Sequence, residues 1–143
     1  MSTYRKETVP IPVPSPITQP FWDATKEHRL LLQTCESGHI FYYARSHCPN
    51  CLSSQLEWVE ASGRGKLYSY TVAWREQSPD FAADVPYIIA AITLDEGPRM
   101  TSLLVETKPE DVEIGGAVEL VWDDVSPEIS MPYFRPVAKV GAA

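Results

Sequence analysis

The sequence predicts a mainly β chain in which a short helix and a metal-binding knuckle precede a small closed barrel of five strands. Several segments between residues 67 and 137 alternate apolar and polar side chains with the period of two that is typical of strands. Cysteines at positions 35, 48 and 51 lie together before these segments. Since no helix between the strands is long enough for a βαβ crossover, we do not expect a parallel sheet.

Composition and charge limit the function. The chain has 143 residues, 44% of them hydrophobic and 22% charged, which suits one ordinary domain or a small domain with an appendage. Its formal net charge is −7, and its 12 lysines and arginines are scattered along the sequence. A surface for nucleic acid or for an anionic membrane normally needs clustered basic residues, so both partners are disfavoured.

The setting of the chain is predicted from its apolar runs and its cysteines. No run approaches the ~20 apolar residues that span a bilayer, and the first residues show no signal peptide. The three cysteines are an odd number, and Cys48 and Cys51 are too close for an ordinary disulfide. A reduced, cytoplasmic setting with thiolates on a metal is the interpretation that fits.

The elements before the knuckle are an arm and a helix. Residues 1–17 are rich in proline and valine, and proline alternates with valine and isoleucine over residues 9–14, which indicates an extended arm that is either disordered or laid across a partner. Residues 18–29 predict a short helix capped by Thr18. Its apolar stripe consists of Phe21, Trp22, Thr25 and His28. This helix docks either on its own domain or on another chain, and residues 30–32 then begin a strand.

The first three barrel strands follow in order. In residues 67–74 the aromatic side chains and Val72 occupy one face of a strand. Residues 86–94 form a nearly continuous apolar run, which predicts a strand buried on both faces. A turn at residues 95–98 leads to a third strand, residues 99–106, so these two strands make a hairpin.

The last two strands complete the barrel. Residues 109–112 predict a single helical turn, and residues 118–123 alternate as a fourth strand. Residues 131–137 supply a fifth strand at the edge of the sheet, where Pro132 and Pro136 are tolerated. Short strands joined by hairpins and one helical turn are typical of a small closed barrel of the OB-fold type.

The segment from Cys35 to Cys51 carries the metal-binding chemistry. Two residues separate Cys48 from Cys51, so both sulfurs can face one ion from a single turn, and Cys35 and His39 offer a second pair. The expected zinc ligands are therefore Cys35, His39, Cys48 and Cys51. His47 adjoins Cys48 and has less suitable geometry. Four protein ligands would make the zinc structural, and the alternative is a knuckle without metal, its residues serving as ordinary turn residues.

An ordered set of short motifs resembles a known family. The motifs are Phe21 and Trp22, Leu31-Leu32-Gln33, Tyr43 and Arg45, Cys48-Pro49-Asn50-Cys51, Gly63-Arg64-Gly65, Tyr68-Ser69-Tyr70-Thr71-Val72, Pro86-Tyr87, Asp95-Glu96-Gly97-Pro98-Arg99, Ile114-Gly115 and Phe134-Arg135-Pro136. Over residues 18–137 the chain resembles the proteins that join a rubredoxin-like zinc ribbon to an OB-fold, named domain of unknown function thirty-five. It departs from them where Ser37 or Gly38 replaces a second cysteine.

The resemblance implies a role beside acyl-CoA chemistry. Members of this family accompany thiolase-like enzymes and related hydratase or aldolase complexes, where they bridge catalytic subunits or help to accommodate CoA. The resemblance thus implies an accessory subunit in a hetero-oligomer with such an enzyme. The expected division is an arm at 1–17, a helix and ribbon at 18–60 and a barrel at 61–143. Arg45, Arg64 and Arg99 are candidate contacts to CoA phosphates.

An independent catalytic site is not indicated. The sequence contains no Gly-x-Ser-x-Gly elbow, P-loop or dinucleotide fingerprint. Acidic pairs such as Asp123-Asp124 have the pattern of solvated turns, and His28 is expected to pack on the helix stripe. Two alternatives stay open. The aromatic residues at 68, 70 and 74 could stack on single-stranded nucleic acid, or the chain could itself be an acyl-CoA-dependent enzyme.

Overall fold

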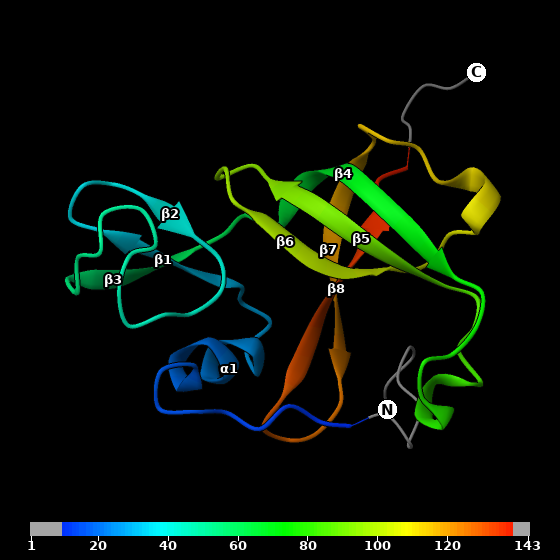
Figure 1. Cartoon of the computed structure of the whole chain (residues 1–143), viewed down its shortest axis with the longest axis horizontal. Coiled ribbons are helices and arrows are strands. Elements are labelled where there is room, and N and C mark those ends of the chain that lie inside the picture. The colour runs from blue at the N-terminus through cyan, green and yellow to red at the C-terminus, as the bar shows by residue number, and fades with distance from the viewer. Residues whose placement is uncertain (1–9, 139–143) are drawn as a thin grey trace.

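The computed structural model describes residues 10–138; the predicted arm at 1–17 therefore lies partly outside the described residues, as do residues 139–143. The elements in chain order are α1 (Gln19–Thr25), β1 (Leu31–Cys35), β2 (Ile40–Phe41), β3 (Leu56–Glu60), β4 (Arg64–Ala73), η1 (Pro79–Phe81), β5 (Tyr87–Leu94), β6 (Arg99–Leu104), η2 (Pro109–Asp111), β7 (Ala117–Asp124) and β8 (Ser130–Pro136). Figure 1 shows a small sheet with α1 beneath it on one side and the barrel on the other.

The small sheet forms the predicted knuckle. Its strand order is β2-β1-β3, and β1 pairs antiparallel with both neighbours. The predicted strand at 30–32 therefore begins one residue later and continues to Cys35, while β3 was not among the predicted strands. Because β1 ends at Cys35, the sheet delivers this cysteine directly to the tip of the knuckle.

The five remaining strands close into a barrel in the order β4-β5-β6-β8-β7. Its neighbouring strands pair antiparallel except β6 and β8, which are parallel. The fourth strand of the barrel thus returns beside the first, as in the Greek-key barrel of the OB-fold. This confirms the predicted fold class, mainly β with a helix, a ribbon-like knuckle and a five-stranded barrel.

The last strand is not an edge strand, so that prediction was wrong. β8 lies between β6 and β7, and it pairs with β7 from Ser130 to Pro136. The ladder between β8 and β6 is limited to Leu104 and Phe134. Pro132 lies outside that short ladder, so the N–H that proline lacks is not needed for a hydrogen bond to β6. The Pro132 carbonyl instead accepts a hydrogen bond from the Ser102 hydroxyl at 2.6 Å.

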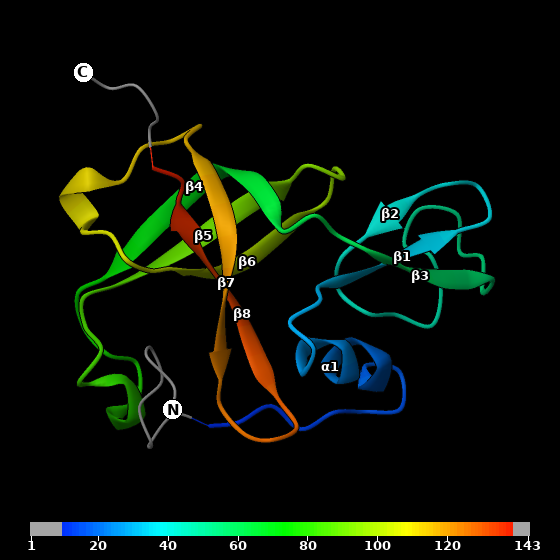
Figure 2. The same ribbon diagram turned by 180° about the vertical axis from the view of Figure 1, so that it is seen from behind.

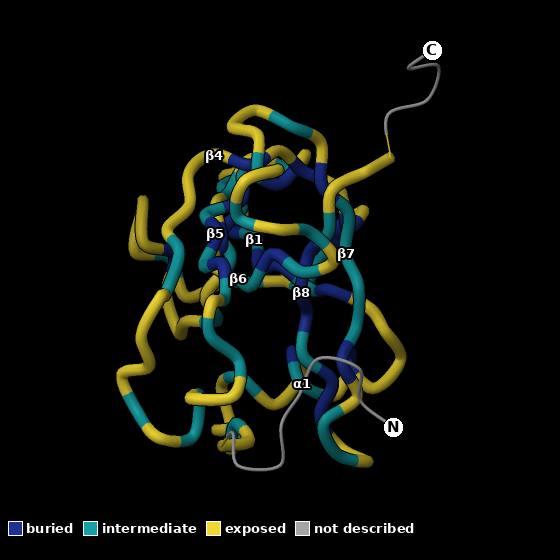
Figure 3. The backbone as a smooth tube through the Cα atoms, turned by 90° about the vertical axis from the view of Figure 1, so that its right-hand side faces the viewer, coloured by how far each residue is buried: buried dark blue, intermediate teal, exposed yellow. Residues whose placement is uncertain are grey.

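The barrel core comes from one face of each strand. In β5, buried residues alternate with half-buried ones, so this strand has one core face and was wrongly expected to be buried on both. The core residues are Leu67, Ile88, Ala90, Ile92, Leu94, Met100, Leu104, Val118 and Phe134. Figure 3 shows buried positions where the strands and α1 meet, and exposed loops around them. The outer face of β5 keeps a half-buried apolar surface.

Helix α1 ends earlier than predicted, at Thr25 instead of Arg29. The His28 N–H donates to the Thr25 carbonyl and the Arg29 N–H to the Ala24 carbonyl, while His28 takes a φ of 57°. These two hydrogen bonds around a residue in the left-handed conformation form the Schellman motif, which ends a helix. His28 therefore lies beyond the helix.

Helix α1 docks on its own chain. Phe21 is buried and meets Tyr42 of the knuckle edge-to-face, with 5.9 Å between the ring centroids. One turn further along the same face, the fully buried Thr25 accepts a hydrogen bond from the Ser130 N–H in β8 at 3.1 Å. The core of the barrel continues through Phe21 into Leu30 and Leu32. The helix therefore joins ribbon and barrel, as Figure 2 shows from behind.

Among the described residues, the structure contains no helix that is long and apolar enough to span a membrane.

Candidate metal centre and its surroundings

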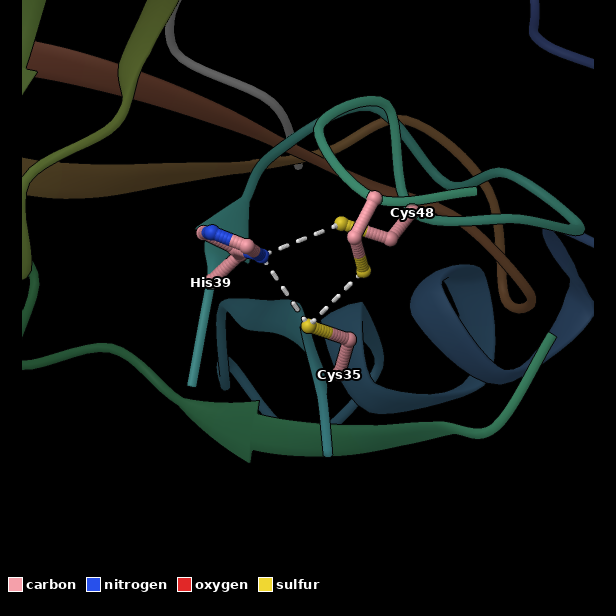
Figure 4. Close-up of side chains that lie close together, drawn as sticks. Cys35, His39 and Cys48 are labelled. Carbon is pink, nitrogen blue, oxygen red and sulfur yellow. Dashed lines mark hydrogen bonds between the residues drawn. The ribbon is translucent and has the colours of Figure 1, made fainter. Parts of the chain in front are cut away.

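Four side chains meet at the tip of the knuckle. The ligand atoms of Cys35, His39, Cys48 and Cys51 all lie within 4.8 Å of one another. His39 Nδ1 is 3.3 Å from Cys35 Sγ and 3.7 Å from Cys48 Sγ, and the sulfurs of Cys35 and Cys51 are 3.7 Å apart. Figure 4 shows Cys35, His39 and Cys48 pointing toward one another from separate parts of the knuckle.

This donor set fits zinc. Zn²⁺ prefers four sulfur and imidazole ligands in a tetrahedron, with Zn–S bonds of about 2.3 Å, which implies sulfur–sulfur edges of about 3.8 Å. The measured separation between the sulfurs of Cys35 and Cys51, 3.7 Å, agrees with such an edge. Cys35 and Cys48 are buried, so most of the cluster is shielded from water, whereas Cys51 is exposed.

The first ligand pair is positioned by the turn between β1 and β2. The Cys35 N–H donates to the His39 carbonyl at 3.1 Å, and the Gly38 N–H donates to the Cys35 carbonyl at 3.0 Å. Gly38 has a φ of 83°, a conformation that favours glycine, and so the chain can reverse within four residues. The reversal brings the imidazole back over the sulfur of Cys35.

The second ligand pair lies in another tight turn. The Leu52 N–H donates to the Cys48 carbonyl, and the Cys48 N–H donates to the Ser53 carbonyl, both at 2.8 Å. The Asn50 N–H points at Cys48 Sγ, 3.4 Å away. These bonds fix the turn that carries Cys48 and Cys51.

The thiols of the cluster differ in acidity. Burial opposes ionisation of Cys35, but hydrogen bonds from the backbone at His39 and Ser37 and from the side chains of His39 and Cys51 outweigh it and lower its pKa to about 6. For Cys51, the backbone hydrogen bond at Ser53 lowers the pKa, but burial and the neighbouring thiols outweigh it, and the pKa is raised. Cys35 is thus ionised near neutral pH, in the form that binds metals.

The remaining candidate residues lie outside this cluster of four side chains. His47 is exposed and lies 2.9 Å from the Ser46 hydroxyl, outside the cluster. Arg45 belongs to the knuckle, Arg64 begins β4 and Arg99 begins β6. Within residues 10–138 none of these three guanidinium groups forms an ion pair. Arg99 lies over the ring of Tyr68, 3.5 Å from its centroid.

Sequence reasoning missed the clamp that holds the knuckle to β1. Gln33 is buried, and its side-chain carbonyl accepts a hydrogen bond from the Arg45 N–H at 2.7 Å. Its amide group donates to the Arg45 carbonyl at 3.1 Å. A glutamine at an alternating position of a strand with apolar neighbours was the available signal, because a buried amide needs partners.

The structure gives His28 and the acidic pair partners that the sequence does not show. The His28 ring stacks on Trp122 with a 7° interplanar angle, and its Nε2 lies 2.7 Å from Asp124 Oδ1. Asp123 is buried, with an exposed fraction of 1%, so the prediction of two solvated turn residues was wrong for it. Both aspartates belong to β7.

The aromatic residues of β4 and the loop after it face solvent instead of the barrel core. The exposed fractions are 52% for Tyr68, 37% for Tyr70 and 67% for Trp74. Tyr70 and Trp74 are therefore available to meet a ligand or a partner, whereas the Arg99 guanidinium covers one face of the Tyr68 ring.

Comparison with known proteins agrees with this architecture. Residues 22–57 match the family described as "ChsH2, rubredoxin-like zinc ribbon domain", and residues 58–123 match "ChsH2, C-terminal OB-fold domain". A "DUF35 domain-containing scaffold protein" of Methanocaldococcus jannaschii is 39% identical over 104 residues, which are 71% of this chain and 73% of that protein. The chain belongs to the DUF35 family of zinc-ribbon and OB-fold proteins.

Two further similar proteins are informative. A chain of the solved "Ltp2-ChsH2(DUF35) aldolase" superposes with a TM-score of 0.79 and 35% identity, over 90% of this chain and all of that one. A "Probable enoyl-CoA hydratase alpha subunit" of Thermomonospora curvata is 39% identical over 118 residues, 81% of this chain. This DUF35 chain spans only 36% of that hydratase subunit.

Proposed function

We propose that this DUF35 protein is a non-catalytic accessory subunit of a complex that acts on acyl-CoA substrates. The observation that supports it most is the likeness, over 90% of the chain, to the DUF35 component of a solved aldolase. The name of a hydratase alpha subunit that is 39% identical, and those of scaffold proteins in the same family, point to the same class of role.

The knuckle is proposed to hold a structural zinc ion through Cys35, His39, Cys48 and Cys51. Bound there, zinc would supply a cross-link between the two turns and no open position for water, since four protein ligands complete its tetrahedron. The chain's own residues prepare that site: the turns place the donors, and burial of Cys35 and Cys48 excludes solvent. Stabilisation of the ribbon beside α1 is the expected consequence.

The partner is proposed to be a thiolase-like or related acyl-CoA enzyme. Arg45, Arg64 and Arg99 form no ion pair within the described part of the chain, which leaves them available for the phosphates of CoA at a shared boundary.

Co-purification tests this function. The tagged chain is expressed together with the thiolase-like product of a neighbouring gene, and retention through size exclusion is the expected result. Acyl-CoA turnover should require the partner, and the isolated chain should have none. If the chain never retains that enzyme, the accessory role is refuted; turnover by the isolated chain would favour the alternative of an independent enzyme.

A nucleic-acid binder is the second candidate, favoured by the exposed rings of Tyr68, Tyr70 and Trp74. The net charge of −7 opposes it. A salt-dependent mobility shift of a labelled single-stranded oligonucleotide at micromolar protein would support this candidate, and no shift would count against it.

A further inference from the structure

Two cavities adjoin on the outer surface of the barrel, away from the metal ligands. The first has a volume of about 290 Å³ and extends from Pro86 and Tyr87 to Val105 and Pro109. The second has a volume of about 370 Å³ and extends from Ile89 to Trp22 of α1. Phe81, Leu103 and Tyr133 border both cavities, so the two form one groove along β5, β6 and β8.

The walls of this groove are mostly hydrocarbon and aromatic. Leu103 lies at its middle, and Ile89 of β5 is its cross-strand partner. Phe81 packs against Tyr87 with 6.0 Å between ring centroids. The hydroxyl of Ser102, which also borders the groove, donates to the Pro132 carbonyl at 2.6 Å. The Ser102 hydroxyl therefore already has a hydrogen-bond partner within the protein.

The charged groups lie at one end. Asp84 and Glu106 border the first cavity only, and Glu106 is paired with Arg135 at 3.1 Å. The second cavity has no charged lining residue within the described part of the chain. A ligand with an apolar chain and at most one polar group at its end matches this distribution of lining residues, because burying a charge without a partner is costly.

The N-terminal arm limits what can enter. Pro10 and Pro12 of the arm border the second cavity together with Ile89, Trp22 and Tyr42. Figure 1 shows the arm passing beneath α1 and across the end of the β7–β8 hairpin. A helix is about 10–12 Å across and would have to displace the arm. An unbranched hydrocarbon chain is much thinner and can lie beneath it.

We propose that this groove binds the hydrocarbon chain of an acyl ligand, with Leu103, Phe81 and Tyr133 as its central walls. Each cavity is near the lower end of the roughly 300–1,000 Å³ that is usual for small-molecule sites. The identity of the ligand as an acyl group rests on the proposed function, whereas the affinity for a hydrocarbon chain follows from the groove itself.

The test uses the isolated full chain, labelled with nitrogen-15, and titrates it with sodium decanoate and with n-decanol. We expect saturable amide shifts at Ile89, Leu103 and Val105 with both probes. Leu103→Asp places a carboxylate in the middle of the groove and should weaken binding at least tenfold. Ile114→Asp is the matched control, because Ile114 is 58% exposed and borders neither cavity, and it should bind as the unaltered chain does.

The outcomes separate this inference from the proposed function. No saturation, shifts confined to other surfaces, or unchanged binding by Leu103→Asp overturns the groove site even if the partner enzyme co-purifies. If Leu103→Asp loses its dispersed amide spectrum, Phe81→Ala replaces it, since Phe81 lies in η1 outside the barrel core. Unchanged binding by Phe81→Ala would then overturn the site. Failure of co-purification alone leaves hydrocarbon binding intact.

Discussion

At the scale of single residues, this DUF35 protein depends on a few polar side chains in buried or half-buried places. Gln33 and Thr25 are buried and each bonds to a distant backbone group. His28 and Asp124 are more exposed, but they tie the end of α1 to β7. Such contacts matter for stability because a polar group that is buried without a hydrogen-bond partner destabilises the fold.

Replacing Gln33 by leucine should destabilise the protein. The change removes two part-buried hydrogen bonds to the Arg45 backbone, and a typical hydrogen bond contributes about 0.5–1.5 kcal/mol to stability. Chemical denaturation measures the free energy of unfolding. The control is Gln77→Leu, at an exposed loop position, which should change it little. Equal effects of the two variants would contradict the clamp.

The His28–Asp124 contact should be visible in a pH titration. The hydrogen bond from His28 lowers the pKa of Asp124 below its ordinary value. Since the pKa is lower in the folded state, the contact's contribution is complete above the unfolded pKa of about 3.9 and is lost as the pH falls through the folded pKa.

Carbon-detected NMR of the Asp124 carboxyl checks this directly. In His28→Ala its pKa should rise toward the ordinary value, whereas Lys26→Ala should leave it where it is in the unaltered chain. A pKa for Asp124 that does not respond to the loss of His28 would show that the contact is absent in solution.

At the scale of elements, each ligand pair depends on its own turn. The turn between β1 and β2 presents Cys35 and His39, and the turn that begins at Cys48 presents the second pair. Neither turn is long enough to be stable alone, so a metal that joins them would act as the missing core of the knuckle.

Zinc content distinguishes the two neighbouring histidines. Protein purified without chelator should contain about one zinc per chain, as a four-ligand site requires. His39→Ala should lose most of it and melt at a lower temperature, while His47→Ala, whose ring lies outside the cluster, should keep it. Elemental analysis and thermal unfolding measure both. The same zinc content in the two variants would refute His39 as a ligand.

At the scale of the whole molecule, α1 makes one body of ribbon and barrel. The hydrophobic core runs without interruption from the barrel through Phe21 to Leu30 and Leu32. The boundary proposed at residues 60 and 61 is thus a change of sheet within a shared core, and the division into separate domains stays a prediction.

Truncating Phe21 should therefore affect both sheets at once. Phe21→Ala removes a buried ring that contacts Trp22 and Tyr42, and such changes cost about 3–5 kcal/mol. Unfolding followed by tryptophan fluorescence and by circular dichroism should give coincident transitions, both shifted. Trp74→Ala, at a 67% exposed position, is the control and should cost much less. A shift in one signal only would indicate that the two sheets unfold separately.

What the sequence by itself determined is local. Alternation placed the strands at residues 67–74 and 118–123, and a continuous apolar run placed the strand at 86–94. The proline and glycine positions placed the turns, and the spacing of Cys48 and Cys51 identified half of the cluster, because these patterns act over a few residues. Only the tertiary structure decided the contacts between distant segments. Barrel closure put β8 between β6 and β7, and it brought Asp124 to His28 across 96 positions. No local period encodes such pairings, since they arise when separate apolar faces share one core.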